Sequence, residues 1–215
     1  LPDRRGLNPN TLGQDSFIIK YNSGGLYEWG TILGTNDPFD DIESIAYYKD
    51  PSTLEEIIAV TGWTTGTLIT NSNLEGTSDI FIAVYSANQT SPSGNTQSIS
   101  YLSGIQTGTT FIDIGWDIKF DLQGNIIIVC SVGGPIYLEP WYGGYSDALV
   151  LVYDKGLSSQ TPLWSKTLGT DGLDTFICLG VDENGVIYAG GTTTSSLFID
   201  NAGTDEDIFI TKFKQ

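Results

Sequence analysis

The sequence contains no histidine and no methionine, and basic residues are scarce in it. Only 9 lysines and arginines stand against 26 aspartates and glutamates, which gives a net charge of −17. This balance argues against nucleic acid as a partner, because lysine and arginine would have to neutralise the phosphates. It argues equally against binding to an anionic membrane surface. A large acidic charge keeps a protein soluble and suits an extracellular setting.

Cysteine is scarce as well, and no hydrophobic run approaches the ~18 residues of a membrane-spanning helix, so we expect no membrane insertion. Cys130 and Cys178 lie in the apolar stretches "IIIVCSV" and "TFICLGV". These surroundings favour two buried thiols, with a disulfide between them as the alternative. Without histidine, the usual nucleophile–base pairs and cysteine–histidine metal sites are missing, so we expect neither an enzyme nor a cofactor.

Four octamers in the chain align without gaps: "DSFIIKYN" from Asp15, "DIFIAVYS" from Asp79, "DALVLVYD" from Asp147 and "DIFITKFK" from Asp207. Strand side chains alternate between two faces, and these octamers carry apolar residues at both odd and even positions. A strand that is apolar on both faces is packed between two layers. The octamers therefore indicate one structural unit, stacked repeatedly so that each copy is buried by its neighbours.

The rest of the unit recurs with the octamer. A turn and a further strand follow the first three octamers, and tight turns such as "LQGN" and "DENG" join two more strands. Four short antiparallel strands per unit, with almost no helical periodicity, are typical of a β-propeller blade. We interpret residues 1–215 as a single all-β, propeller-like segment with units at about 15–78, 79–146, 147–206 and a partial unit at 207–215.

The segments "DIFITKF", "LWSKTLG" and "GVDENGVIYAGGT" make the unit similar to the SBBP-type β-propeller repeat. The similarity covers residues 15 to 215 and is looser in the second unit, which lacks the tryptophan. The resemblance implies a propeller fold and an extracellular or cell-surface location. This family has no common reaction, so the resemblance assigns no catalytic residue.

Counting strands by analogy with that family predicts thirteen. The expected groups are two strands in 15–34, full blades in 42–105 and 116–168, and three strands in 175–214. This amounts to about three and a quarter blades, whereas propellers close with at least ~4 blades. We therefore expect an open arc or a part of a larger propeller. Further blades of the same polypeptide, or a partner chain, would cover the exposed strands.

The loop at residues 133–147, "GGPIYLEPWYGGYSD", is the most distinctive segment because its equivalents in the other units are mostly small and polar. It carries Tyr137, Trp141, Tyr142 and Tyr145 among glycines. Aromatic residues on such a loop can stack on sugar rings or anchor a protein partner. The alternative is that they pack over a neighbouring blade.

Acidic turns offer a second, weaker candidate. The turns "GTNDPFDD" and "GTDGLD" match each other and could supply calcium ligands from Asp37, Asp40, Asp41, Asp171 and Asp174. Their spacing fits no strong calcium motif, and such turns are usually only turns. The aspartates that head the octamers are expected to accept hydrogen bonds where the long loops enter the strands. The sequence "NQT" at Asn88 is a glycosylation sequon in a polar turn.

These observations favour a non-enzymatic extracellular or surface scaffold that binds a protein or a glycan through the face formed by the long loops. One alternative is a structural subunit that assembles through exposed blade edges. Another is a fragment of a carbohydrate-active propeller enzyme. The fold alone does not choose among them.

Overall fold

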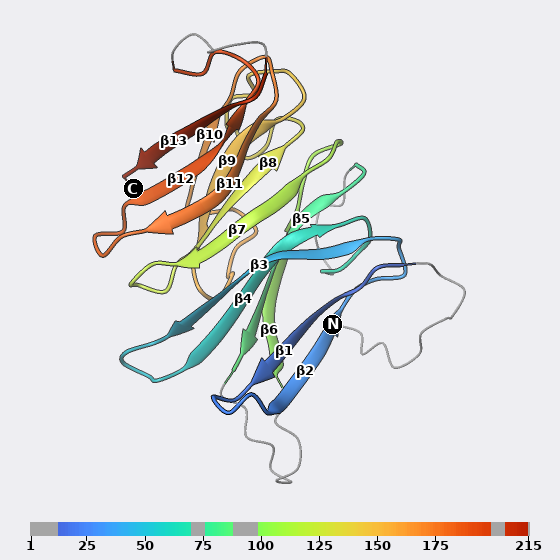
Figure 1. The fold of residues 1–215 in the computed structure, drawn as a ribbon, viewed down its shortest axis with the longest axis vertical. Coiled ribbons are helices and arrows are strands. Elements are labelled where there is room, and N and C mark those ends of the chain that lie inside the picture. The colour runs from blue at the N-terminus through green and yellow to red at the C-terminus, as the bar shows by residue number, and fades with distance from the viewer. Residues whose placement is uncertain (1–12, 70–75, 88–98, 199–204, 215) are drawn as a thin grey trace.

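In the computed structural model, the described residues are 13–69, 76–87, 99–198 and 205–214. Within them the chain is all-β, without helix, and contains thirteen strands in four antiparallel sheets (Figure 1). The strands are β1 (Ser16–Tyr21), β2 (Tyr27–Leu33), β3 (Asp40–Lys49), β4 (Glu56–Thr64), β5 (Asp79–Ser86), β6 (Ser100–Thr107), β7 (Ile114–Phe120), β8 (Ile126–Val132), β9 (Asp147–Tyr153), β10 (Trp164–Leu168), β11 (Asp174–Val181), β12 (Ile187–Thr193) and β13 (Asp207–Phe213).

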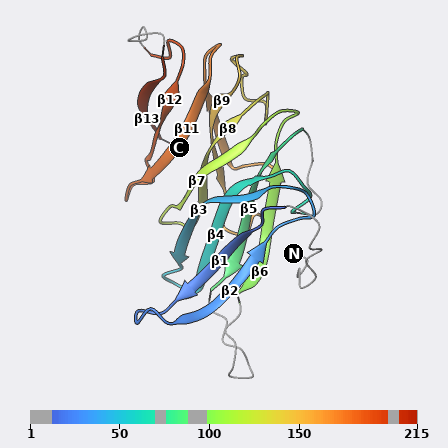
Figure 2. The same cartoon turned by 45° about the vertical axis from the view of Figure 1, so that its right-hand side comes forward.

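The sheets are meanders in which each strand pairs with its neighbour in the chain. Sheet 1 holds β1–β2, sheet 2 holds β3–β6, sheet 3 holds β7–β10, and sheet 4 holds β11–β13. This grouping confirms the predicted number of strands and their division among the sheets. No described strand of sheet 1 pairs with one of sheet 4, so pairing between these strands does not close a ring. The two outermost sheets lie at opposite ends of the stack (Figures 1 and 2).

Each strand position in the sheets has a fixed role. In the order of the chain, a complete sheet consists of an inner strand (β3, β7), a second strand (β4, β8), a head strand (β5, β9) and an outer strand (β6, β10). The head strands begin at the octamer aspartates. Among the described residues, sheet 1 contains only a head strand and an outer strand, and sheet 4 shows no outer strand. The four-stranded unit expected from the repeat is therefore complete twice.

Alternation along the head strands explains why the sheets stack. In β5, Ile80 and Ile82 pack into the cluster shared with sheet 3, whereas Phe81 and Ala83 pack into the cluster shared with sheet 1. All four side chains are buried. We call the face of a sheet that is turned toward the preceding sheet its leading face, and the opposite one its trailing face. Every interface in the molecule therefore joins a trailing face to the next leading face.

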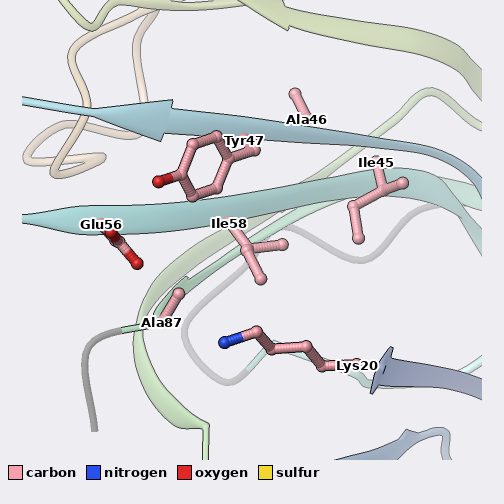
Figure 3. A pocket seen from close by; sticks show the side chains of 7 residues that line it. All are labelled: Lys20, Ile45, Ala46, Tyr47, Glu56, Ile58 and Ala87. Carbon is pink, nitrogen blue, oxygen red and sulfur yellow. The ribbon is translucent and has the colours of Figure 1, made fainter. Parts of the chain in front are cut away.

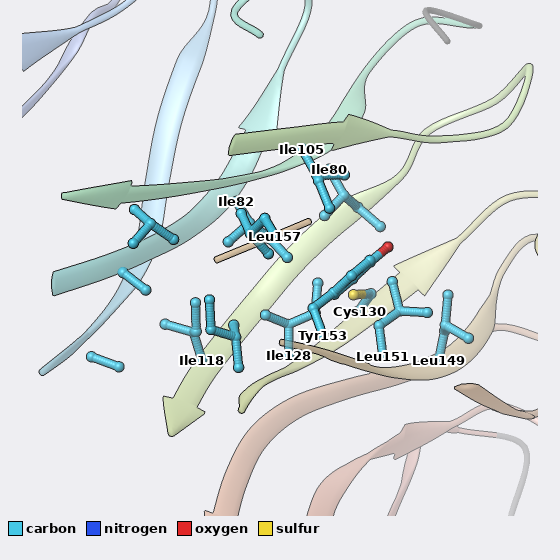
Figure 4. Packing of buried hydrophobic residues seen from close by; sticks show 14 of the residues in the cluster. Ile80, Ile82, Ile105, Ile118, Ile128, Cys130, Leu149, Leu151, Tyr153 and Leu157 are labelled. Atoms are coloured by element: carbon cyan, nitrogen blue, oxygen red, sulfur yellow. The ribbon is translucent and has the colours of Figure 1, made fainter. Parts of the chain in front are cut away.

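The largest core cluster lies between sheets 2 and 3 (Figure 4). Ile80, Ile82 and Ile105 from sheet 2 contact the side of sheet 3 that carries Ile118 and Leu151, and all of them are fully buried. Burial of one such aliphatic side chain contributes about 1.5–3 kcal/mol. A third cluster between sheets 3 and 4 repeats the arrangement. Stacking of this kind, rather than any single contact, holds the sheets together.

The two cysteines differ in environment. Cys130 is buried in the cluster between sheets 2 and 3, as expected, and burial raises the pKa of its thiol. Cys178 is exposed on β11, so the prediction that it is buried is wrong. The two residues are not joined by a disulfide. Cys178 belongs to the trailing face of sheet 4, which no other described sheet covers.

This difference predicts that one thiol per chain reacts with a maleimide in the folded protein. Cys178 should be labelled within minutes, and Cys130 only after unfolding, because a buried neutral thiol is both inaccessible and unreactive. Intact-mass spectrometry before and after denaturation measures both. In the Cys178→Ser variant the folded protein should take up no label, and rapid labelling of that variant would contradict the described core.

Candidate functional site

Three equivalent junctions connect successive sheets through a threonine and an aspartate. At the second junction, the backbone amide and the hydroxyl of Thr109 both donate to the Asp113 carboxylate, at 2.5 and 3.0 Å. The amide of Gly133 donates to the other oxygen, at 2.9 Å. The same pattern joins Thr35 to Asp40 and Thr170 to Asp174. The junctions thus order the turns that lead into the inner strands.

Each of these aspartates lies beside the aspartate that heads the preceding octamer. A Cβ atom on Gly108 would clash with a carboxylate oxygen of Asp79 and with one of Asp113, so both carboxylates adjoin the glycine backbone. Gly34 and Gly169 lie in the same way against Asp15 and Asp147. Any residue other than glycine would displace a carboxylate. At each junction the two carboxylates are close enough for their charges to interact: Asp15 with Asp40, Asp79 with Asp113, and Asp147 with Asp174.

Burial changes the acidity of these groups. It raises the pKa of Asp113 to about 6, and the charge of Asp79 acts in the same direction. It likewise raises the pKa of Asp147 to about 6, with a further contribution from Asp174. The pKa of Asp40 is raised for the same reason. Because these side chains are almost entirely shielded from solvent, the geometry does not offer them to a substrate as an acid–base pair.

The five aspartates proposed as calcium ligands do not share one environment: two are buried, and the other three lie toward the surface of their turns. Asp40 and Asp174 are buried and engaged by threonines of their own turns. Asp41 accepts a hydrogen bond from Gln14, at 3.0 Å, and Asp171 accepts one from Ser195, also at 3.0 Å. The remaining candidate, Asp37, is exposed at the tip of its turn. Within residues 13–69, 76–87, 99–198 and 205–214, no three acidic or cysteine side chains gather as they would around a metal ion.

Asp113 was missed by the sequence reasoning, although it belongs to the same set as Asp40 and Asp174. Its turn, "GTTFID", shares the glycine and threonine of the other two and has the same length as "GTDGLD", but it contains no second acidic residue. The recurring Gly-Thr pair ahead of an aspartate was the available signal. The role expected for the octamer aspartates is confirmed at Asp147, which accepts a hydrogen bond from the Tyr142 amide, at 2.8 Å.

The aromatic loop between β8 and β9 is held at both of its ends. At its start, the Tyr137 hydroxyl lies 2.7 Å from the Thr107 hydroxyl and 3.0 Å from that of Tyr153. Burial raises the pKa of Tyr137, which packs against the core between sheets 2 and 3. Tyr137 thus has the packing role that was the alternative to recognition.

The middle and the end of the loop are fixed by polar contacts. Glu139 accepts hydrogen bonds from the Ser165 hydroxyl at 2.8 Å and from the Thr167 amide at 3.2 Å, which ties the loop to β10. The Tyr145 amide donates to the Gly172 carbonyl at 2.9 Å. Gly144 lies against Gly172 and has a positive φ of 74°, so a side chain would fit there neither sterically nor conformationally. The loop is therefore ordered by the Glu139 side chain and by backbone contacts. The rings of Trp141, Tyr142 and Tyr145 take no part in these hydrogen bonds.

Three of the four predicted aromatic residues remain at the surface. Tyr145 is 86% exposed and Tyr142 is 45% exposed, while Trp141 is half-buried. Exposed aromatic rings on an anchored loop present apolar area that loses little conformational freedom when a ligand binds. These three residues are the surviving recognition candidates. The sequon at Asn88 lies outside the described residues.

No family model matches the chain, and no curated protein matches it either. The resemblance to the SBBP-type repeat therefore stays a prediction that rests on the quoted motifs. Among the described residues, no helix has the length and apolar character needed to cross a membrane.

The buried aspartates predict that the protein is more stable at mildly acidic pH than at neutral pH. The folded-state pKa of Asp113, about 6, lies above its ordinary value of 3.8. Its protonation therefore favours the folded state below about pH 4, and this contribution is lost as the pH rises through 6. The free energy of unfolding should fall by on the order of 3 kcal/mol at most through this group. Urea unfolding at several values between pH 4.5 and 7.5 measures it.

A matched pair of variants assigns this dependence to the buried group. Asp113→Asn should flatten the slope of unfolding free energy against pH, because the amide does not titrate. Asp171→Asn, at an exposed turn, should keep the slope of the unmodified protein. Asp50, whose pKa is lowered by its ion pair with Lys155, titrates below this window. An unchanged slope in Asp113→Asn would contradict the assignment.

Proposed function

We propose that the chain is a non-enzymatic scaffold and interaction module, built from propeller-type repeats and located outside the cell or on its surface. In this proposal the four sheets are successive blades of an open array, or a part of a larger propeller. The stacked sheets, the meander order and the recurring Thr–Asp junctions support the blade interpretation. The acidic net charge of −17 supports the location and disfavours nucleic acid as a partner.

The binding surface that we propose is the anchored loop with Trp141, Tyr142 and Tyr145. The observation that carries this proposal is the combination of exposed aromatic rings with a backbone fixed at Glu139 and Tyr145. A protein or a glycan is the class of ligand that stacks on such rings. The equivalent loops of the other units carry fewer aromatic residues, so this surface distinguishes one blade from the rest.

Assembly through exposed strands is the second candidate, and it is favoured by a separate observation. Phe17, Tyr21 and Ile32 are exposed on the leading face of sheet 1, and Ile208 and Ile210 are exposed on the trailing face of sheet 4. The equivalent faces inside the molecule are buried. A carbohydrate-active enzyme receives less support, because the carboxylates of the three pairs are buried, apart from the half-buried Asp15.

The loop proposal predicts that Trp141→Ala and Tyr142→Ala reduce binding without unfolding the protein. An array of defined oligosaccharides is the first probe, followed by titration of any hit with tryptophan fluorescence as the signal. We expect a loss of about tenfold or more for each variant, because each removes an aromatic contact surface. Circular dichroism should show an unchanged fold.

Tyr137→Phe is the matched control. It keeps the ring in the core and removes only the hydroxyl, so binding should persist while stability falls by about 1 kcal/mol. If Trp141→Ala unfolds the protein, the loop has a packing role. If both loop variants bind an oligosaccharide as well as the unmodified chain does, the surface lies elsewhere.

A further inference from the structure

The junction between sheets 3 and 4 differs from the other two junctions in its hydrogen bonds. Its two carboxylates, Asp147 and Asp174, are both 0% exposed. One oxygen of each has a partner, because Asp147 accepts from the Tyr142 amide and Asp174 accepts from Thr170. The other oxygen of each, Oδ1, is enclosed by protein and has no hydrogen-bond partner. A buried carboxylate oxygen without a partner is unfavourable.

The inner-strand aspartate of the first junction shows what is different at Asp174. Thr64 lies opposite Asp40 in the pairing of β3 with β4, and its hydroxyl donates to Asp40 Oδ1. Thr193 lies opposite Asp174 in the same way. Its hydroxyl, however, donates to the Ser195 carbonyl at 2.9 Å. Asp174 Oδ1 is therefore without the donor that its counterpart has.

The head-strand aspartate is also held differently at this junction. Gln106 of β6 donates from Nε2 to Asp79 at 2.9 Å. Thr167 of β10 holds the register position of Gln106, because each pairs with the residue two places after its octamer aspartate. The hydroxyl of Thr167 is buried and has no partner. Residues two apart on a strand share a face, as do paired residues, so this hydroxyl and the Asp147 carboxylate lie on the same face of sheet 3.

Three buried oxygens without a partner thus belong to one junction: Asp147 Oδ1, Asp174 Oδ1 and Thr167 Oγ1. Burial raises the pKa of Asp147 and the charge of Asp174 adds to this effect, so the two carboxylates are close enough to interact. In the part of the chain that the structure describes, neither carboxylate forms an ion pair with a lysine. A cation is the partner that would satisfy all three oxygens at once.

The depression beside β1 and β3 does not offer this chemistry (Figure 3). It has a volume of about 290 Å³, and its lining includes Ile45, Tyr47 and Ile58. Glu56 contributes the one carboxylate among the residues that line it. Oxygen ligands for a cation therefore gather at the junction of Asp147 and not at this depression.

We propose that this junction binds a calcium ion through Asp147 Oδ1, Asp174 Oδ1 and Thr167 Oγ1. A divalent cation neutralises both carboxylates, and oxygen is the ligand that calcium prefers. Backbone carbonyl and water oxygens complete the flexible shell that calcium accepts, whereas magnesium demands near-ideal octahedral geometry. Asp174 alone of the five aspartates proposed from the sequence belongs to this site.

The number of charged ligands sets the expected affinity. The site has two carboxylates, and the described residues contain no group of three acidic or cysteine side chains that could hold a metal ion. Calcium affinity falls as the ligands carry fewer charges and as the site becomes less rigid. We therefore expect a Kd of about 10⁻⁴–10⁻³ M, the range of extracellular calcium-binding modules.

The site adjoins the loop of Trp141, because the Tyr142 amide donates to the second oxygen of Asp147 at 2.8 Å. Calcium would fix the carboxylate against which this part of the loop is ordered. The inference nevertheless goes beyond the proposed function, since it needs no ligand of the loop. Calcium binding is measured without any oligosaccharide, so the two proposals fail separately.

Calcium chloride and the full chain test the site directly, after treatment with EDTA and its removal. Isothermal titration calorimetry at about pH 7.5 should show one saturable site. Urea unfolding should show a folded-to-unfolded ratio that rises by nearly tenfold between about 1 and 10 mM calcium. Magnesium chloride at the same ionic strength is the control for charge screening and should stabilise the protein less.

Two variants assign the effect to the junction. Asp147→Asn removes one of the two charges and should weaken calcium binding by at least about tenfold. Asp113→Asn removes the buried carboxylate of the second junction, where Thr109 and Gly133 satisfy both oxygens, so its response to calcium should persist. Each variant is compared with itself in EDTA, which separates calcium binding from a change in basal stability.

Thr167→Val keeps the shape of the side chain and removes the third ligand. Without calcium this variant should be at least as stable as the unmodified protein, because a buried hydroxyl without a partner has been removed. With calcium it should bind about threefold more weakly or worse. A threonine that only fills space would show no difference that depends on calcium.

Four results would overturn the proposal. The first is the absence of binding heat and of stabilisation at about 10 mM calcium. The second is equal stabilisation of Asp147→Asn, which places the ion elsewhere on the acidic chain. The third is equal stabilisation by magnesium, which identifies screening of the net charge. If calcium has no effect and Asp147→Asn is the more stable protein at neutral pH, the two carboxylates share a proton and bind no metal.

Discussion

Burial of both faces of the head strands is the constraint on which the rest of the structure depends. A strand with apolar side chains on both faces is stable only between two sheets, so β5 and β9 require a sheet on each side. Stacking, in turn, places the inner strands β7 and β11 beneath the preceding sheets. Because the sheets follow one another in the order of the sequence, each trailing face is covered by the leading face of the next sheet. Within the part of the chain that the structure describes, no sheet covers the leading face of sheet 1 or the trailing face of sheet 4.

The Thr–Asp junctions show how the stack accommodates polar groups. Each junction brings two interacting carboxylates to the boundary between sheets, in a chain that already carries a large negative charge. Hydrogen bonds from Thr109 and Gly133 satisfy Asp113 without a counter-ion, and burial favours its protonated form. The carboxylates therefore order the turns at the cost of stability at neutral pH. Their recurrence at three junctions identifies them as parts of the repeat.

Much of this architecture could be predicted from the sequence, because the octamers carry their own structural information. Period-two alternation identified the strands, and the resemblance to the SBBP-type repeat predicted their number and division into sheets. The burial of Cys178 was predicted wrongly because alternation shows which residues share a face, but not whether another sheet covers that face. Asp113 was missed because its turn has no second acidic residue, whereas the turns of Asp40 and Asp174 also contain Asp37 and Asp171. Tyr137 could not be separated from Tyr142 in sequence, since its partners Thr107 and Tyr153 lie in other strands.

A repeat protein has to be interpreted through the places where its copies differ. Features present in every unit serve the stack, as the paired aspartates and the buried head strands do. The loop of Trp141 departs from its equivalents in composition. This departure adds aromatic surface without changing the stack. Because stacking does not account for it, this loop is where binding to other molecules has the strongest physical basis.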